Sequence, residues 1–165
     1  MALYALGDLH LSFQADKAMD VFGRVWRHHE RKIEYALVGT KGFTFEGPFY
    51  LNRRGEVIGW DEEREAHARK LVTRETERLR DSFDQAEKAG FRKFIMFLHY
   101  PPTSILEETS PFTEIAKEYG AEAVVYSHCH GESRFGDSIR GDFQGIRYML
   151  VSGDYLNFRP ALVME

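Results

Sequence analysis

Cysteine is nearly absent from this sequence: Cys129 is the single one among 165 residues. One cysteine excludes an internal disulfide, which is compatible with a reducing compartment. Long apolar runs are missing too, because no stretch approaches the roughly 18 apolar residues that a membrane-spanning helix needs. The first apolar run, Ala2–Leu6, is broken by Gly7 and lacks the basic start of a secretory signal peptide. We therefore expect a cytoplasmic protein that does not cross a membrane.

An excess of positive charge is also missing. The formal net charge at pH 7 is −4, whereas proteins that bind nucleic acid usually present basic patches to its phosphates. We therefore expect no nucleic-acid partner. The same charge does not exclude a small phosphorylated substrate, because a buried metal pair can attract phosphate locally.

Internal repeats, low-complexity tracts and interdomain linkers are absent as well, so we expect a single domain spanning residues 1–165. The sequence alternates between apolar runs and amphipathic segments, which predicts an α/β layer architecture. The expected strands are Ala2–Leu6, Tyr35–Val38, Lys93–Leu98, Ala121–Tyr126 and Ile146–Ser152. The expected helices are Asp16–Glu34, Asp61–Ala89 and a helix that Ser110 and Pro111 begin and Tyr119 ends. Residues Phe43–Trp60 are expected to form a hairpin or an irregular loop.

Side chains that can bind a metal follow the ends of three predicted strands. In α/β proteins, functional sites form in the crevice beyond the carboxyl ends of the strands. We therefore expect these side chains to converge on one metal site. The five candidate ligands are Asp8, His10, His99, His128 and His130.

The spacing and the residue types of these candidates indicate the chemistry. Asp-x-His and His-x-His place two side chains on the same side of an extended segment. Imidazole and carboxylate together suit Mn²⁺, Fe, Zn²⁺ or Co²⁺. Two such metals a few Å apart can hold a phosphate and generate a hydroxide nucleophile near neutral pH. The pattern therefore predicts phosphoester hydrolysis without a covalent enzyme intermediate.

Each motif taken alone also has an ordinary structural interpretation. Gly-Asp-x-His is a common turn, and a single histidine after a strand is often a structural hydrogen-bonding residue. The agreement of order, strand-end placement and spacing favours a metal site. The remaining candidates are expected to have structural roles: His28, His29 and His67 at the surface or in packing, Cys129 in the core, and Asp154 and Asn157 in a turn.

Three stretches of the sequence resemble the calcineurin-like metallophosphoesterases, and a bacterial subgroup of uncharacterised predicted phosphohydrolases in particular. Residues 7–12 (GDLHLS) are similar to the first family motif, residues 97–102 (FLHYPP) to the isolated-histidine motif, and residues 127–131 (SHCHG) to the late Gly-His-x-His motif. Further similarity lies in residues 19–33, 38–42 and 150–156. The resemblance therefore covers nearly the whole chain.

The resemblance implies a fold, a reaction and a division of ligands. The fold would be a four-layer sandwich in which helices flank two packed mixed sheets. The reaction would be hydrolysis of phosphomonoesters or phosphodiesters. Asp8, His10 and His130 would bind a first metal, and His99 and His128 a second.

Two central family motifs are absent between residues 33 and 35, where the chain is shortened by about two strand–helix units, on the order of 60 residues. Gly-Asp-x-x-Asp would supply the carboxylate that bridges both metals, and Gly-Asn-His would supply a ligand and the proposed general acid. Without them the catalytic residues are unknown. The metal site is dinuclear in the family, and a mononuclear site with three ligands is the alternative here. The lost strands would expose apolar edges, which favours dimerisation or aggregation.

Three interpretations follow from this pattern. The first is a metal-dependent phosphohydrolase that acts on a small phosphorylated substrate. The second is a catalytically impaired metal-binding or interaction protein on the same scaffold. The third is an internally deleted form of a normal enzyme.

Overall fold

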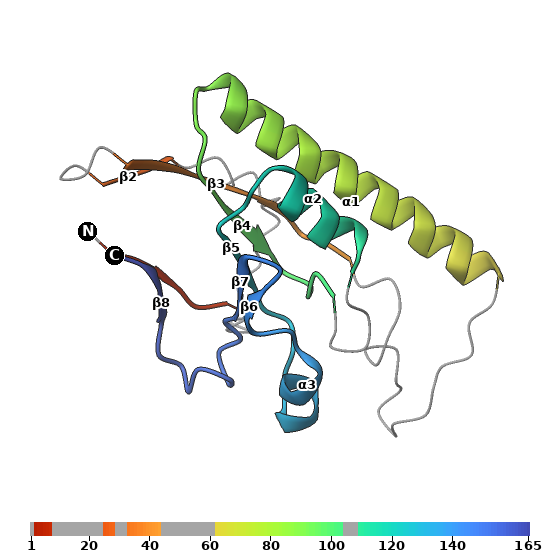
Figure 1. Ribbon diagram of the computed structural model, residues 1–165. Helices are drawn as coiled ribbons and strands as arrows, with labels where there is room; N and C mark the ends of the chain where they lie inside the picture. The colour runs from red at the N-terminus through yellow and green to blue at the C-terminus, as the bar shows by residue number, and fades with distance from the viewer. Residues whose placement is uncertain (1, 8–24, 29–32, 44–61, 104–108) are drawn as a thin grey trace, which may run out of the picture.

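The computed structural model describes residues 2–7, 25–28, 33–43, 62–103 and 109–165 (Figure 1). Every structural statement below concerns this part of the chain. Its elements in chain order are β1 (Leu3–Ala5), β2 (Val25–His28), β3 (Ile33–Thr40), α1 (Glu62–Lys88), β4 (Phe94–Leu98), α2 (Pro111–Glu118), β5 (Ala123–Tyr126), α3 (Glu132–Asp137), β6 (Gly141–Phe143), β7 (Ile146–Leu150) and β8 (Ala161–Met164).

The strands form two sheets. The larger is six-stranded with the order β2-β3-β4-β5-β7-β6, and the smaller pairs β1 with β8. Strands β3, β4, β5 and β7 are parallel neighbours, whereas β2 and β6 run antiparallel at the two edges. The protein is therefore a mixed α/β fold with two sheets, which confirms the α/β prediction.

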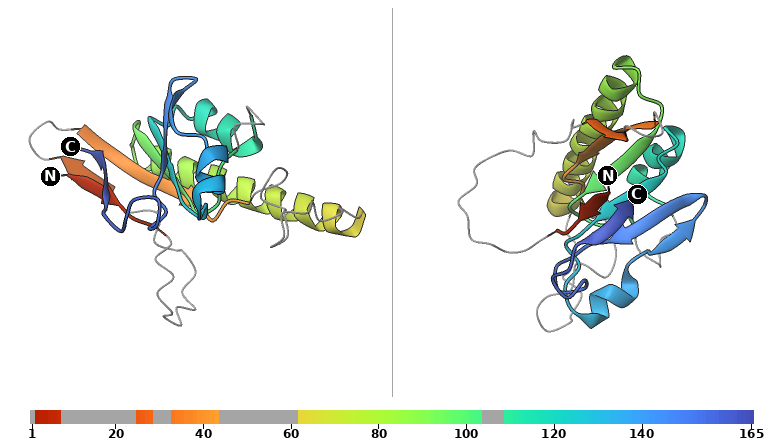
Figure 2. Two further views of the ribbon diagram at one scale, coloured as in Figure 1. Left: turned by 90° about the horizontal axis from the view of Figure 1, so that it is seen from below. Right: turned by 90° about the vertical axis from the view of Figure 1, so that its left-hand side faces the viewer.

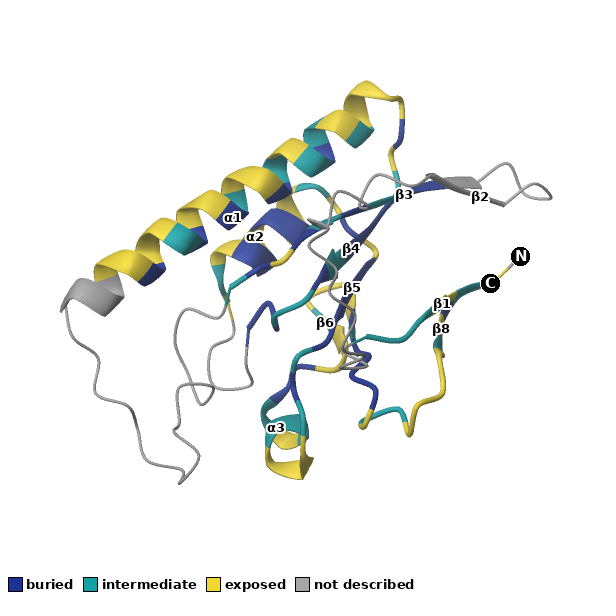
Figure 3. Cartoon of the chain, turned by 180° about the vertical axis from the view of Figure 1, so that it is seen from behind, coloured by how far each residue is buried: buried dark blue, intermediate teal, exposed yellow. Residues whose placement is uncertain are grey.

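Helices α1 and α2 cover one face of the larger sheet (Figures 1 and 3). Leu79 and Phe83 of α1 are fully buried against this face, where the Phe83 ring meets Phe94 edge-on at a centroid distance of 5.3 Å. The β1–β8 pair packs against the opposite face, where Val163 joins Ile95 in a second apolar cluster. The two ends of the chain lie next to each other at this pair (Figure 2). The larger sheet thus has an apolar cluster on each side.

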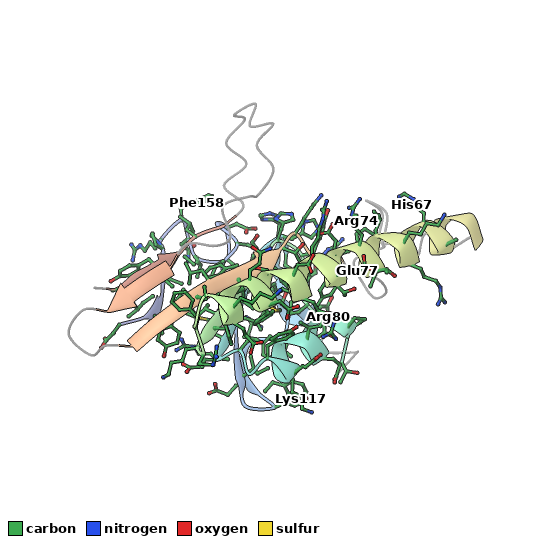
Figure 4. The ribbon with its side chains drawn as sticks, turned by 90° about the horizontal axis from the view of Figure 1, so that it is seen from above. His67, Arg74, Glu77, Arg80, Lys117 and Phe158 are labelled. Atoms are coloured by element: carbon green, nitrogen blue, oxygen red, sulfur yellow. The ribbon has the colours of Figure 1, made fainter. Side chains whose placement is uncertain are left out.

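Helix α1 is amphipathic, as its sequence predicts. The charged residues Arg74, Glu77 and Arg80 lie along its surface, and His67 is exposed near its beginning (Figure 4). The helix ends at Lys88, and the amide of Gly90 donates to the Glu87 carbonyl at 2.9 Å. None of the described helices is long and apolar enough to cross a membrane.

Helix α2 begins where the sequence predicts. The Ser110 hydroxyl oxygen accepts from the amides of Phe112 and Thr113 at 3.1 and 3.3 Å, while the Ser110 amide donates to the Thr113 hydroxyl at 2.8 Å. This reciprocal capping box satisfies amides that the first helical turn leaves unpaired. The helix therefore begins at Pro111, which has no amide hydrogen to satisfy.

The predicted helix Asp16–Glu34 is wrong in the part that the structure describes. Val25–His28 is a strand, and it pairs antiparallel with β3 from Val25 opposite Ala36 to His28 opposite Ile33. Strand β2 covers the backbone edge of β3 and forms inter-strand hydrogen bonds with it. These bonds outweigh the helical spacing of the apolar residues, because such spacing gives only a weak preference for a helix. Residues 16–24 and 29–32 lie outside the described residues, as does nearly all of Phe43–Trp60, the predicted hairpin or irregular loop.

Candidate metal centre

Two of the predicted ligand segments follow neighbouring parallel strands. His99 comes directly after β4, and His128 and His130 come shortly after β5. Because β4 and β5 are parallel and adjacent, their carboxyl ends deliver these histidines to the same edge of the sheet. Asp8 and His10, the other two candidates, lie outside the described residues.

Gly7, which precedes Asp8 in the sequence, reaches the same edge. Its amide donates to the Val151 carbonyl at 2.8 Å, and it forms a parallel bridge with Ser152. A Cβ atom added to Gly7 would lie 2.8 Å from the Cβ of Ser127, so the position has no room for a side chain. The first motif thus packs closely against Ser127 of the third motif.

Ser127 also contacts the second motif. Its amide donates to the His99 carbonyl at 3.2 Å, and its hydroxyl oxygen lies 3.4 Å from Nδ1 of His99. The described residues of all three predicted motifs therefore meet around Ser127. Convergence of all five candidate ligands on one metal site stays a prediction, because Asp8 and His10 lie outside the described residues.

The closest contact between candidate ligands joins His99 and His128. Nε2 of His99 lies 3.2 Å from Nδ1 of His128, and both rings are half-buried. Two nitrogens bound to one metal at about 2.1 Å, with an angle of about 100° at the metal, would be about 3.2 Å apart. The pair therefore fits two positions in the coordination shell of a single transition metal.

The backbone around His128 differs from the predicted extended His-x-His segment. His128 has a φ of 70°, and the amide of Cys129 donates to the Ser127 carbonyl at 2.9 Å. A three-residue turn of this kind is rare and strained for a residue with a side chain, and such strain gathers at functional sites. The prediction that His128 and His130 share one side of an extended segment is therefore wrong. The turn instead directs His128 toward His99.

Cys129 is buried in the cluster on the helical side of the sheet, which confirms its predicted core role. Burial raises the pKa of its thiol above the ordinary value. Since the thiolate is the form that binds metals, this environment disfavours Cys129 as a ligand.

Tyr100 and Lys41 flank the histidine pair. The amides of His99 and Tyr100 both donate to the Lys41 carbonyl at 3.1 Å, which ties the end of β4 to the end of β3. The Tyr100 ring lies 4.8 Å from that of His99 and 4.4 Å from that of His128, measured between centroids. The Lys41 ammonium lies over the Tyr100 ring, 5.3 Å from its centroid. The sequence offered Lys41 only as part of a similar stretch, not as a site residue.

His130 lies against Asp154 from the segment after β7. The Nδ1 atom of His130 is 2.8 Å from Oδ1 of Asp154, and both side chains are about one-third exposed. Asp154 also accepts from the amides of Gly131 at 3.0 Å and Tyr155 at 2.9 Å. Its contact with the Tyr155 amide fits the predicted turn role, whereas its contact with His130 was not predicted.

The pKa of the Asp154 carboxyl reflects two opposing effects. Burial raises it, but the hydrogen bonds from His130 and from the Gly131 and Tyr155 amides outweigh burial and lower it below the ordinary value. Hydrogen bonds to the charged form of a carboxyl group favour that form. Asp154 is therefore an anion near neutral pH.

A cavity of about 470 Å³ adjoins the histidine pair. It lies between β1 and the face of the larger sheet that the helices leave uncovered, and its lining is mostly apolar. Gly7, His99 and Ser127 are among the residues that line it. The candidate metal centre thus borders an apolar space between the two sheets.

Within the residues that the structure describes, no group of three or more His, Cys, Asp or Glu side chains is arranged to hold a metal ion. The structure brings His99 and His128 together and pairs His130 with Asp154. Comparisons with known proteins give no match: no family model matches the sequence, and neither a curated protein nor a solved structure is significantly similar.

Proposed function

We propose that this protein is a metal-dependent phosphoric ester hydrolase of the calcineurin-like metallophosphoesterase type. The observation that carries the proposal is the 3.2 Å separation between ring nitrogens of His99 and His128. Those histidines come from the second and third motifs. Gly7 of the first motif packs against Ser127, which contacts His99. The carboxyl ends of adjacent parallel strands are where functional sites form in α/β proteins, and histidines without a shared function would not be expected to pair there.

The ligand assignment follows the resemblance. His99 and His128 would hold one metal, and Asp8, His10 and His130 would hold the other. A divalent transition metal such as Mn²⁺, Fe, Zn²⁺ or Co²⁺ would supply Lewis acidity and a bound water with a pKa of about 7. The three histidines are partly exposed, which leaves access for water and a substrate.

Lys41 completes the proposed substrate site. Its ammonium rests over the Tyr100 ring, and that ring touches both histidines of the pair. A cation held in this position attracts the negative charge of a phosphoric ester. Lys41 would therefore help to bind substrate without being a metal ligand.

The proposal includes the finer description of the fold. The two sheets would be what remains of a four-layer sandwich that has lost about two strand–helix units. In support, the smaller sheet has two strands among the described residues, and the apolar cavity lies beside it. Interior strands missing next to β1 would leave an apolar space of this kind.

Hydrolysis of bis-p-nitrophenyl phosphate in the presence of Mn²⁺ tests the proposal. The unaltered protein is expected to release p-nitrophenol, and the Asp8→Ala and His99→Ala variants are expected to lose at least 90% of that rate, because each lacks a proposed ligand (roughly tenfold or more per ligand). His67→Ala is the matched control, since His67 is exposed on α1. Equal rates for all four proteins would refute the proposal.

A metal-binding protein without turnover is the second candidate. It is favoured by the absence of the Gly-Asp-x-x-Asp and Gly-Asn-His motifs. Without these motifs the chain lacks the family's bridging carboxylate and its proposed general acid. The two candidates differ in one result. Binding of Mn²⁺ that depends on His99, with no hydrolysis above background, would favour the second candidate.

A further inference from the structure

Three nitrogen atoms lie within hydrogen-bond distance of the Asp154 carboxylate. Oδ1 accepts from the Tyr155 amide at 2.9 Å and lies 2.8 Å from Nδ1 of His130, while Oδ2 accepts from the Gly131 amide at 3.0 Å. The two backbone amides fix the plane and position of the carboxylate. The imidazole of His130 therefore meets an acceptor that is already held in place.

The elements that carry the two residues are also fixed relative to each other. His130 follows β5 and Asp154 follows β7, and these strands are parallel neighbours with Tyr126 opposite Leu150. The segment after β7 is closed by a backbone hydrogen bond from the Phe158 amide to the Gly153 carbonyl at 2.7 Å. The contact therefore joins the segments that follow two neighbouring parallel strands.

We propose that Asp154 is a positioning residue that keeps the imidazole proton of His130 on Nδ1, so that Nε2 presents its lone pair to a metal. This inference rests on the proposed metal-dependent function. A carboxylate that accepts from one ring nitrogen fixes the tautomer and orientation of a metal-binding histidine and raises its basicity. The charge of Asp154 serves this role, since an anion is a strong acceptor for the Nδ1 proton.

A purely structural role for Asp154 makes a different prediction. If the carboxylate served only to hold the turn, its removal would lower stability through the Gly131 and Tyr155 amides and leave the His130 tautomer unchanged. The tautomer of His130 after removal of the Asp154 carboxylate therefore distinguishes a positioning role from a purely structural one.

Long-range ¹H–¹⁵N NMR of the metal-free protein reads the tautomer directly. At about pH 8.5, two units above the usual histidine pKa of about 6.5, we expect the proton of His130 on Nδ1 in the unaltered protein. In Asp154→Ala we expect a shift toward the Nε2-protonated form. Asp142→Ala is the matched control, because Asp142 is an exposed carboxylate in β6. A proton on Nε2 in the unaltered protein, or an unchanged tautomer in Asp154→Ala, would overturn the inference.

If Asp154→Ala does not fold, the Asp154→Asn variant tests the same positioning role. The asparagine oxygen can still accept from one backbone amide, but it lacks the charge that holds the imidazole proton. We expect the fraction of His130 that is protonated on Nδ1 to lie between the fractions in the unaltered protein and in the alanine variant. A His130 tautomer identical to that of the unaltered protein would contradict the positioning role of the charge.

Competition with a zinc-chelating dye measures the consequence for the metal. We expect Asp154→Ala to bind Zn²⁺ roughly 10- to 100-fold more weakly than the unaltered protein, the usual effect of removing such a partner. Equal affinity would overturn the inference. If the unaltered protein bound no Zn²⁺ but kept the His130 proton on Nδ1 through Asp154, the proposed function would fail and the positioning role would stand.

Discussion

At the scale of single residues, close approach of the backbone explains why Gly7 is a glycine. A Cβ atom there would lie 2.8 Å from the Cβ and 3.0 Å from the Oγ of Ser127, a contact that neither backbone can relieve cheaply. Ser127 in turn contacts His99 through its amide and hydroxyl. The missing side chain at Gly7 is therefore what allows the first motif to pack against the other two.

Replacing Gly7 with alanine should destabilise the protein by about 1–3 kcal/mol, the usual cost of forcing an extra carbon into a packed site. Urea denaturation followed by circular dichroism measures this difference. Gly136→Ala is the matched control, because nothing lies within 4 Å of a Cβ at that position. Equal free energies of unfolding for the two variants would show that the Gly7 contact is not a constraint.

Some features of the site could be predicted from the sequence, and others depend on geometry that a sequence pattern does not carry. His99 and His128 could be predicted to meet, because each follows a strand in an α/β chain. The φ of 70° at His128 could not, since alternation assumes an extended backbone. The partner of His130 could not be identified either, because Asp154 is 24 residues away and comes from a different strand end.

At the scale of elements, strong local sequence signals predicted the two longer helices, α1 and α2. Helix α1 has a long charged face and a glycine after its end, and α2 has a serine cap followed by proline. Three short elements, α3, β6 and β8, were not predicted. Each has only three to six residues, too few for a helical or alternating period to be recognised.

Helix α1 also contacts the strand that leads to the site. Glu75 of α1 is buried, and it accepts a hydrogen bond from the hydroxyl of Thr40 at the end of β3. Arg74 and Arg78 compensate its charge at 2.9 and 3.0 Å. A buried carboxylate is tolerated only when it is paired in this way. The helix thereby holds the end of β3 directly before Lys41.

Packing of α1 against the larger sheet should depend on the buried side chains of the helix, such as Leu79. Leu79 is fully buried, whereas Leu71 on the same helix is only partly buried. Leu79→Ala should cost about 2–5 kcal/mol of stability, because it leaves a cavity in the core. Leu71→Ala removes the same atoms and should cost clearly less. Chemical denaturation of both variants checks this difference, and equal losses would contradict the observed orientation of α1.

At the scale of the whole molecule, the two faces of the larger sheet are covered unequally. Helices α1 and α2 cover one face, while the β1–β8 pair covers the other and leaves a cavity of about 470 Å³. The loss of two strand–helix units between residues 33 and 35 stays a proposal. Dimerisation through the apolar edges stays a prediction.

We propose that three separate motifs build one metal site at the carboxyl ends of β4 and β5. Isothermal titration of the metal-free protein with Zn²⁺ tests this proposal. We expect the unaltered protein and His67→Ala to bind Zn²⁺ equally. We expect His99→Ala and His128→Ala each to bind it at least roughly tenfold more weakly, because each loses a proposed ligand. Failure of the unaltered protein to bind Zn²⁺, or equal affinities in all four proteins, would contradict it.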